Sequence, residues 1–239
     1  ITTGLTDVEH KKQQQNYDIV ILGHNTESFE KALQAIRQGK HVAVITGENN
    51  DTHFADKISI ILQALRACSG YAQAFRSSEK FGILPEKPNI GWHSIKIHIA
   101  DVLERITPHY SYSRLKGYGA TIYEDDPVIE DTTIKAGDTV INAKEIIDTR
   151  SRKTSVKDIT GLEKTGLLYL ENILEWHALP EQPVILGSGS PALELAQYLS
   201  RLGCTTTLIS ENSVLPEADA ELFQILYKTL EQEKIRIIQ

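Results

Sequence analysis

Residues 183–192 read PVILGSGSPA and contain the most informative pattern for the fold. A short apolar run leads into a glycine turn, and residues 191–202 then place apolar side chains at helical spacing. Gly203 stands where a helix ends, and residues 205–209 form a second run that is typical of a buried strand. The pattern predicts a strand, a tight turn, a helix and a parallel strand, which together make one βαβ unit.

The opening of the chain repeats this pattern. Residues 18–22 form an apolar run rich in β-branched side chains, and the run ends at Gly23. Residues 26–38 have helical spacing, and residues 41–45 predict a second buried strand. The sequence therefore indicates that the βαβ unit occurs twice in the chain.

The segment between the two units changes its periodicity halfway. Residues 55–76 and 94–115 have helical spacing, the second interrupted near Pro108, whereas after Gly117 the apolar period falls to two. Four short strands are expected there, at 120–123, 132–134, 139–141 and 145–148. A helix and a strand are expected at 217–233 and 235–238. We predict an α/β fold: a Rossmann-like three-layer domain with a β-meander, then the first half of a second Rossmann-like domain.

The composition and charge of the chain argue against several classes of function. Of the 239 residues, 41% are hydrophobic and 24% are charged, as in an ordinary globular protein. The net charge of −7 argues against nucleic acid as a partner, and no apolar run reaches the ~20 residues of a membrane span. Only two cysteines, Cys68 and Cys204, are present, which favours a reducing, cytoplasmic compartment. The eight histidines show no metal-ligand spacing, and the acids at 125–126 are expected to be solvated.

The second glycine turn has the features of a phosphate-binding loop. A turn between a strand and a helix directs backbone N–H groups toward a pyrophosphate, and its usual pattern is G-x-G-x-x-G or G-x-G-x-x-A. Gly187, Gly189 and Ala192 match that pattern. Ser210 stands at the end of the next strand, where an acid usually binds the ribose. The alternative is an ordinary turn that kept its glycines for tightness.

The first glycine turn departs from the pattern. Gly23 remains, but Asn25 and Ser28 stand at the other two positions, and Thr46 ends the next strand. Asn25 can adopt positive φ, although its side chain occupies space that a pyrophosphate would use. Ser28 is small enough for close packing, and Thr46 can hydrogen-bond a ribose only as an uncharged group.

Two such units separated by a β-meander resemble the FAD-dependent pyridine nucleotide-disulfide oxidoreductases, especially the branch with dihydrolipoamide dehydrogenase and mercuric reductase. The resemblance implies FAD and NAD or NADP as cofactors. It implies that Glu194 lies beside the nicotinamide and the flavin, the alternative being a solvated helix glutamate. The expected boundaries are a flexible tail at 1–16, an FAD-binding-like domain at 17–162 and an incomplete NAD(P)-binding-like domain at 163–239.

Three departures from the family bear on function. The redox cysteine pair that the family carries after its second strand is absent from residues 47–57, and we expect Cys68 and Cys204 to be buried small hydrophobes. Where the family has Ala-Thr-Gly close to the flavin, this chain has Thr149 preceded by Asp148 and followed by Arg150. The Arg150 guanidinium could contact a pyrophosphate, but it also adds bulk where the backbone should approach the flavin closely. The family's dimerisation domain, with its His–Glu pair, is missing, so we expect a fragment or a truncated relative.

Two functional hypotheses follow. The first is an oxidoreductase-like module that passes hydride from NAD(P)H to FAD without dithiol or disulfide chemistry. The second is a non-catalytic relative that acts as a binding or regulatory protein, with dinucleotides and a protein as its partners. The sequence leaves NAD against NADP open, because residues 210–212 offer neither an acid in register for the ribose nor an arginine for its phosphate.

Overall fold

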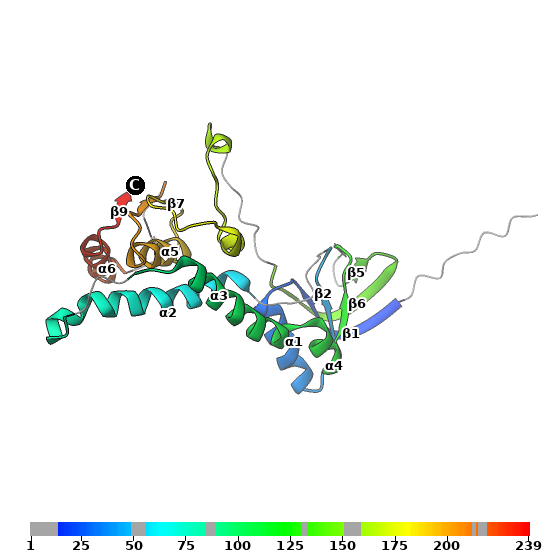
Figure 1. The fold of residues 1–239 in the computed structure, drawn as a ribbon. Coiled ribbons are helices and arrows are strands. Elements are labelled where there is room, and N and C mark those ends of the chain that lie inside the picture. Colours follow the sequence, from blue (N-terminus) through cyan, green and yellow to red (C-terminus); the bar gives the residue numbers. More distant parts are fainter. Residues whose placement is uncertain are drawn as a thin grey trace, which may run out of the picture. The chain divides into compact units, whose positions relative to one another are not determined.

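The computed structural model describes residues 14–48, 56–84, 89–130, 133–150, 159–211, 214 and 219–239. The chain divides into two compact units (Figure 1). Unit 1 comprises Ile1–Asp56 and Arg105–Lys157, and unit 2 comprises Lys57–Glu104 and Asp158–Gln239. Residues 57–104 thus pack with the C-terminal part of the chain, although the sequence order places them between the two halves of unit 1.

Unit 1 contains a six-stranded sheet with the order β3-β2-β1-β6-β5-β4. Strand β1 is parallel to both β2 and β6, and β2 is parallel to β3, whereas β4, β5 and β6 form an antiparallel meander. The strands are β1 (Gln14–Leu22), β2 (Val42–Ile45), β3 (Thr121–Tyr123), β4 (Pro127–Glu130), β5 (Thr133–Ala136) and β6 (Thr139–Asp148). The helices are α1 (Thr26–Arg37) and α4 (Tyr112–Gly117), the latter preceded by a 3₁₀ turn at Thr107–Tyr110.

Apolar side chains on both faces of the parallel strands hold unit 1 together. On one face, Ile21 and Val44 pack in a cluster with Phe29 of α1 and Leu115 of α4. On the other face, alternate strand residues such as Leu22 pack in a cluster with meander side chains, including Ile134 and Ile141. The predicted α/β fold, in which helices pack on a parallel sheet that continues into a β-meander, is confirmed.

The strands of unit 1 differ from the expected ones in three places. Strand β1 begins at Gln14, because residues 14–17 pair with 140–143 of β6, so the expected tail at 1–16 overlaps the sheet. Strand β6 is a single ten-residue strand where two short ones were expected. Strand β4 was not predicted; it is an edge strand that starts with Pro127, a place where a missing N–H does no harm.

Unit 2 contains a three-stranded parallel sheet with the order β7-β8-β9. Its strands are β7 (Val184–Leu186), β8 (Thr207–Ile209) and β9 (Arg236–Ile238), and its helices are α2 (Lys57–Ser77), most of α3 (Trp92–Ile106), α5 (Ser190–Arg201) and α6 (Ala220–Gln232). Short 3₁₀ turns occur at Ser78–Phe81, Leu162–Lys164 and Leu170–Glu175. One apolar cluster joins these elements, with Leu65 of α2, Leu199 of α5 and Leu208 of β8 at its fully buried centre.

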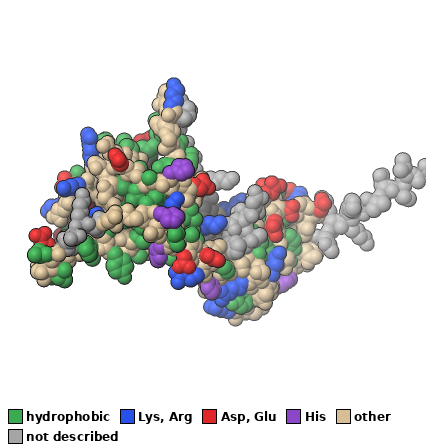
Figure 2. Space-filling view, in the orientation of Figure 1, with side chains coloured by type: hydrophobic (Ala, Val, Ile, Leu, Met, Phe, Trp, Pro, Cys, Tyr) green, Lys and Arg blue, Asp and Glu red, His purple; other side chains and the backbone are tan. Residues whose placement is uncertain are grey.

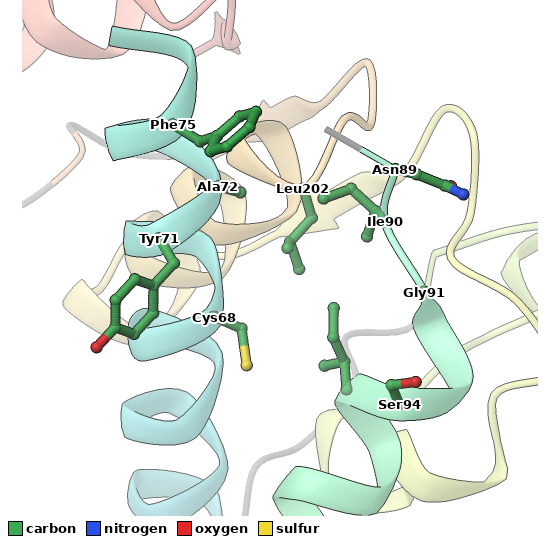
Figure 3. Close-up of a pocket in the computed structure, with 10 residues that line it drawn as sticks. Cys68, Tyr71, Ala72, Phe75, Asn89, Ile90, Gly91, Ser94 and Leu202 are labelled. Atoms are coloured by element: carbon green, nitrogen blue, oxygen red, sulfur yellow. The ribbon is translucent and has the colours of Figure 1, made fainter. Parts of the chain in front are cut away.

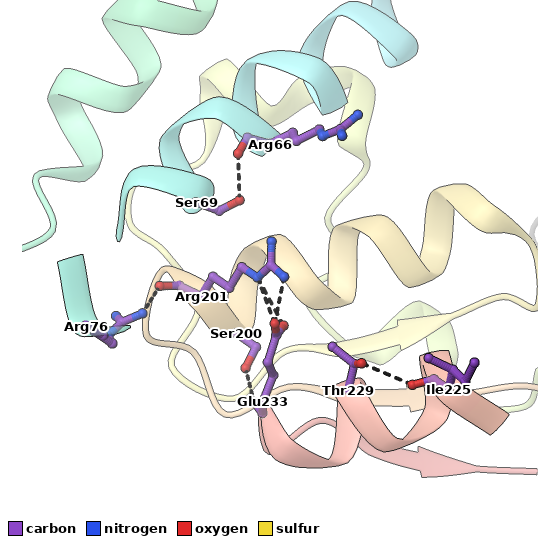
Figure 4. A network of polar contacts seen from close by, with 8 residues as sticks. All are labelled: Arg66, Ser69, Arg76, Ser200, Arg201, Ile225, Thr229 and Glu233. Carbon is purple, nitrogen blue, oxygen red and sulfur yellow. Dashed lines mark hydrogen bonds and ion pairs between the residues drawn. The ribbon is translucent and has the colours of Figure 1, made fainter. Parts of the chain in front are cut away.

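An ion pair connects α5 to the end of α6 (Figure 4). The Arg201 guanidinium donates to both carboxylate oxygens of Glu233 at 2.6 to 3.1 Å, and the Ser200 hydroxyl donates to the Glu233 carbonyl oxygen at 2.6 Å. Arg76 of α2 in turn donates to the Arg201 carbonyl oxygen. The two charged side chains are only 21% and 10% exposed, so solvent screens this pair less than a surface pair.

We predict that Arg201→Ala lowers the free energy of unfolding by about 2 kcal/mol, between the small effect of a surface pair and the larger effect of a buried one. Urea denaturation followed by circular dichroism measures this change. The control is Lys135→Ala, which removes the exposed Lys135–Glu130 pair and should leave the denaturation midpoint unchanged. Equal midpoints for the two variants would contradict the prediction.

Candidate functional site

The first glycine turn leads from β1 into α1. Gly23 has φ +142°, and its amide donates to the Ile45 carbonyl oxygen at 2.9 Å. A Cβ at this position would lie 2.4 Å from Thr149 Oγ1 and 2.8 Å from Ser28 Oγ. Only glycine is compatible with this conformation and this space.

The second glycine turn leads from β7 into α5 with the same local geometry. Gly187 has φ +155°, and its amide donates to the Ile209 carbonyl oxygen at 3.0 Å. A Cβ on Gly187 would lie 2.9 Å from Ala192 Cβ, so the glycine and the small third residue permit the close packing of strand and helix. The two βαβ units therefore share one design.

The two turns differ at the residue that begins the helix. Asn25 caps α1 with φ −150°, so it is extended and does not use the positive φ that asparagine tolerates. Its Oδ1 accepts from the Ser28 amide at 2.9 Å, and Ser28 Oγ accepts from the Asn25 amide at 3.3 Å, which is a capping box. The Asn25 Nδ2 group donates to the Thr149 carbonyl oxygen at 2.6 Å.

Gly189 occupies the equivalent position in the second turn. Its backbone is extended, with φ −85° and ψ 173°, and within the described residues no side chain caps α5. A Cβ at Gly189 would meet no atom nearer than Pro191 Cδ at 3.5 Å, an ordinary contact. The packing of the chain itself therefore does not require glycine here, and the missing side chain leaves space beside the N-terminus of α5.

The residues at the strand ends carry hydroxyl groups. The Thr46 hydroxyl, after β2, lies 3.3 Å from the carbonyl oxygens of Gly47 and Tyr123. Ser210, after β8, is 3% exposed, and its amide donates to the Ile238 carbonyl oxygen at 2.9 Å. Both residues thus take part in the strand-end hydrogen bonding of their own sheets.

The carboxylate of Asp126 lies near the end of β2, although this residue was expected to be solvated. Asp126 Oδ1 accepts from the Glu48 amide at 3.2 Å. Gly47, at φ +72°, lies so close that a Cβ there would be 2.7 Å from this oxygen. The glycine of the Thr-Gly pair at the end of β2 is the sequence feature that could have indicated this contact, because a glycine with positive φ allows another segment to approach the strand end.

Arg150 is held by its own neighbour. Its guanidinium forms two hydrogen bonds to the Asp148 carboxylate, at 2.9 and 2.6 Å, and its amide donates to Asp148 Oδ1 at 3.0 Å. The hydrogen bonds from Arg150 lower the pKa of Asp148 and raise that of Arg150. The guanidinium that was predicted to reach a pyrophosphate is therefore engaged in a local ion pair.

Glu194 lies on α5, one turn before Tyr198. The Tyr198 hydroxyl donates to Glu194 Oε2 at 3.0 Å. Burial, together with this hydrogen bond, raises the pKa of Tyr198 to about 12, so the phenol stays protonated and holds the carboxylate. The side chain of Glu194 is thus positioned by its own helix, whereas its expected role beside a nicotinamide stays a prediction.

The two cysteines are thiols in apolar surroundings. Cys68 lines a pocket between α2 and the residues that lead into α3, with Ala72, Ile90 and Leu202 around it (Figure 3). Cys204 is 8% exposed. Burial raises the pKa of Cys68, and it raises the pKa of Cys204 to about 11. Both surroundings disfavour the thiolate, which is the reactive form.

We predict that Cys204 reacts slowly with 5,5′-dithiobis(2-nitrobenzoate) at pH 8. A pKa of about 11 leaves roughly one thiolate in a thousand at that pH, whereas a pKa of 9 would leave about one in ten. The native rate should rise with pH toward 11, and urea should make both thiols react quickly. Immediate reaction of both native thiols at pH 8 would contradict the prediction, as would a Cys68–Cys204 disulfide found by mass spectrometry.

The placed residues contain no group of three or more His, Cys, Asp or Glu side chains that could hold a metal ion. Among these same residues, no helix has both the length and the apolar character needed to cross a membrane.

The chain is similar to known proteins at two levels, a family model and individual relatives. The family model described as pyridine nucleotide-disulphide oxidoreductase matches residues 183–239. Mercuric reductase of Lysinibacillus sphaericus is 24% identical over 95% of this chain and 42% of its own length. Dihydrolipoyl dehydrogenase of Bacillus subtilis is 24% identical over 93% of this chain and 50% of its own length. This chain therefore spans about half, or less, of the length of these relatives.

A solved structure shares the fold. A copper(II) complex of a mutant of the HOCl-induced flavoprotein disulfide reductase RclA from Escherichia coli has a TM-score of 0.70 and 18% identity, over 94% of this chain and 49% of that one. The repeated strand–glycine–helix turn and the meander thus belong to a fold that this chain shares with a flavoprotein disulfide reductase. The C-terminal part of the chain, residues 183–239, is thus similar to the pyridine nucleotide-disulphide oxidoreductase family, and over nearly its whole length the chain is similar to members of that family.

Proposed function

We propose that the chain binds a nicotinamide dinucleotide at its second glycine turn and performs no dithiol–disulfide chemistry. The observation that carries this proposal is the geometry of Gly187, Gly189 and Ala192 at the N-terminus of α5, which no side chain among the described residues caps. The first glycine and the alanine serve the packing of strand and helix, whereas Gly189 is not needed for packing and leaves room for a ligand. The N–H groups and the positive end of the α5 dipole favour a pyrophosphate there.

The absence of dithiol chemistry is proposed from the cysteines. Thiol–disulfide exchange needs an attacking thiolate and a resolving partner. The chain contains only Cys68 and Cys204, and burial raises the pKa of each. Neither cysteine lies within residues 47–57, where the resemblance to the family places a redox pair.

Of the two functional hypotheses, we favour the non-catalytic one. Hydride transfer from nicotinamide to flavin requires FAD at the first glycine turn, and the residues there do not fit it: the Asn25 side chain already occupies the start of α1 and bonds Ser28 and Thr149. We therefore propose a protein that binds NAD or NADP and acts as a binding or regulatory partner. The net charge of −7 favours partners other than nucleic acid.

We predict that wild-type protein binds NADH or NADPH and that Gly189→Val weakens this binding at least tenfold. The extended backbone of Gly189 accepts valine without strain, but the branched side chain fills the space beside the helix N-terminus. Titration of the nicotinamide fluorescence measures the affinity for each cofactor.

The matched control is Gly70→Ala in α2, where a Cβ meets no atom within 4 Å. This variant should bind the nicotinamide dinucleotide as tightly as the wild type does. The proposal fails if the wild type binds neither NADH nor NADPH, or if Gly189→Val binds as well as the control.

A further inference from the structure

The first glycine turn stands at the switch point of the sheet in unit 1. From β1 the chain crosses through α1 to β2 on one side, whereas β6 pairs with β1 on the other side. In open α/β sheets, the crevice outside the carboxyl ends of two such strands is where a ligand binds. Here the ends are Leu22 and Asp148, which are partners in register.

The side chains of Asn25, Ser28 and Thr149 form hydrogen bonds across this crevice. Asn25 follows the end of β1, Thr149 follows the end of β6, and the Asn25 Nδ2 group joins them at 2.6 Å from the Thr149 carbonyl oxygen. The Thr149 hydroxyl lies 2.8 Å from Ser28 Oγ and donates to the Leu22 carbonyl oxygen at 2.9 Å. Ser28 is 0% exposed and Thr149 is 9% exposed, so these bonds are shielded from water.

The Oδ1 atom of the Asn25 side chain takes the place of a phosphate oxygen that a bound pyrophosphate would supply. A phosphate oxygen at a helix N-terminus accepts from the backbone amides of the first turn, and Asn25 Oδ1 already accepts from the Ser28 amide at 2.9 Å. The second glycine of a dinucleotide turn makes room for the pyrophosphate, and the Asn25 side chain fills that room. Arg150, the residue that directly follows Thr149, forms an ion pair with Asp148.

We infer that the Asn25 side chain is an internal substitute for the pyrophosphate of FAD, and that unit 1 folds without a flavin and excludes one from this crevice. The Asn25 Oδ1 atom satisfies the start of α1, a task that a bound pyrophosphate would otherwise perform, and the Nδ2 group connects this helix to the end of β6. The inference concerns unit 1 and holds whether or not the second turn binds a nicotinamide dinucleotide.

The test combines flavin retention with thermal unfolding. Wild-type protein is incubated with excess FAD and passed through a gel-filtration column. We expect no absorbance band near 450 nm in the protein peak and no change in the unfolding midpoint on adding FAD. Asn25→Ala should lower the midpoint by several degrees, because it removes both the cap and the bond to Thr149.

Two further variants separate the roles of the side chain. Asn25→Ser keeps a cap acceptor but is too short to reach Thr149, so its midpoint should fall between those of the wild type and Asn25→Ala. Asn16→Ala removes an exposed asparagine side chain of the same unit and should leave the midpoint unchanged. If Asn25→Ala does not fold, the serine variant and the wild-type flavin measurement still decide the outcome.

Stoichiometric FAD in the wild-type peak, or a midpoint raised by FAD, would overturn the inference. Equal midpoints for wild type, Asn25→Ser and Asn25→Ala would overturn it as well. A wild type that ignores FAD but also fails to bind NADH and NADPH would leave this inference supported and the proposed function refuted, so the two failures are distinguishable.

Discussion

Both units depend on a strand that turns into a helix so closely that no Cβ fits at the first residue of the turn. At Gly23 the obstructing atoms are Thr149 Oγ1 and Ser28 Oγ, and at Gly187 the obstructing atom is Ala192 Cβ. This close approach sets each helix against its sheet, so that α1 packs on the unit 1 strands and α5 packs on β7 and β8. The N-terminus of each of these two helices then lies at the carboxyl end of a parallel strand, which is where α/β folds bind their ligands.

The residue directly before the helix differs between the two turns and changes how each helix begins. An asparagine side chain at the start of α1 gives the helix its own cap and binds it to the end of β6. A glycine at the start of α5 does neither, and its backbone conformation would accept other residues. The same backbone design therefore gives a closed structural junction in unit 1 and an open helix N-terminus in unit 2, which is why we propose ligand binding at the second turn alone.

The sequence predicted the parts of this structure that depend on neighbouring residues. Glycine turns, helix ends at Gly39 and Gly203 and the apolar strands all follow from local patterns, and the structure has them where they were expected. The pairing of residues 14–16 with β6, and the packing of residues 57–104 with the C-terminal segment, arise from contacts far apart in sequence. The bond from Asn25 to Thr149 spans 124 positions, and no local pattern reveals it. Arg150 was predicted as a phosphate contact, whereas in the structure its guanidinium pairs with Asp148, two residues earlier in the chain.

Two parallel dialyses of the wild-type protein, one against equal concentrations of FAD and NADH and one against FAD and NADPH, test the central claim most directly. The absorbance spectra distinguish the flavin from the nicotinamide in the protein compartment. The account predicts that NADH or NADPH accumulates with the protein and that the FAD concentration is equal on both sides of the dialysis membrane. Accumulation of FAD, with or without NADH, would contradict it.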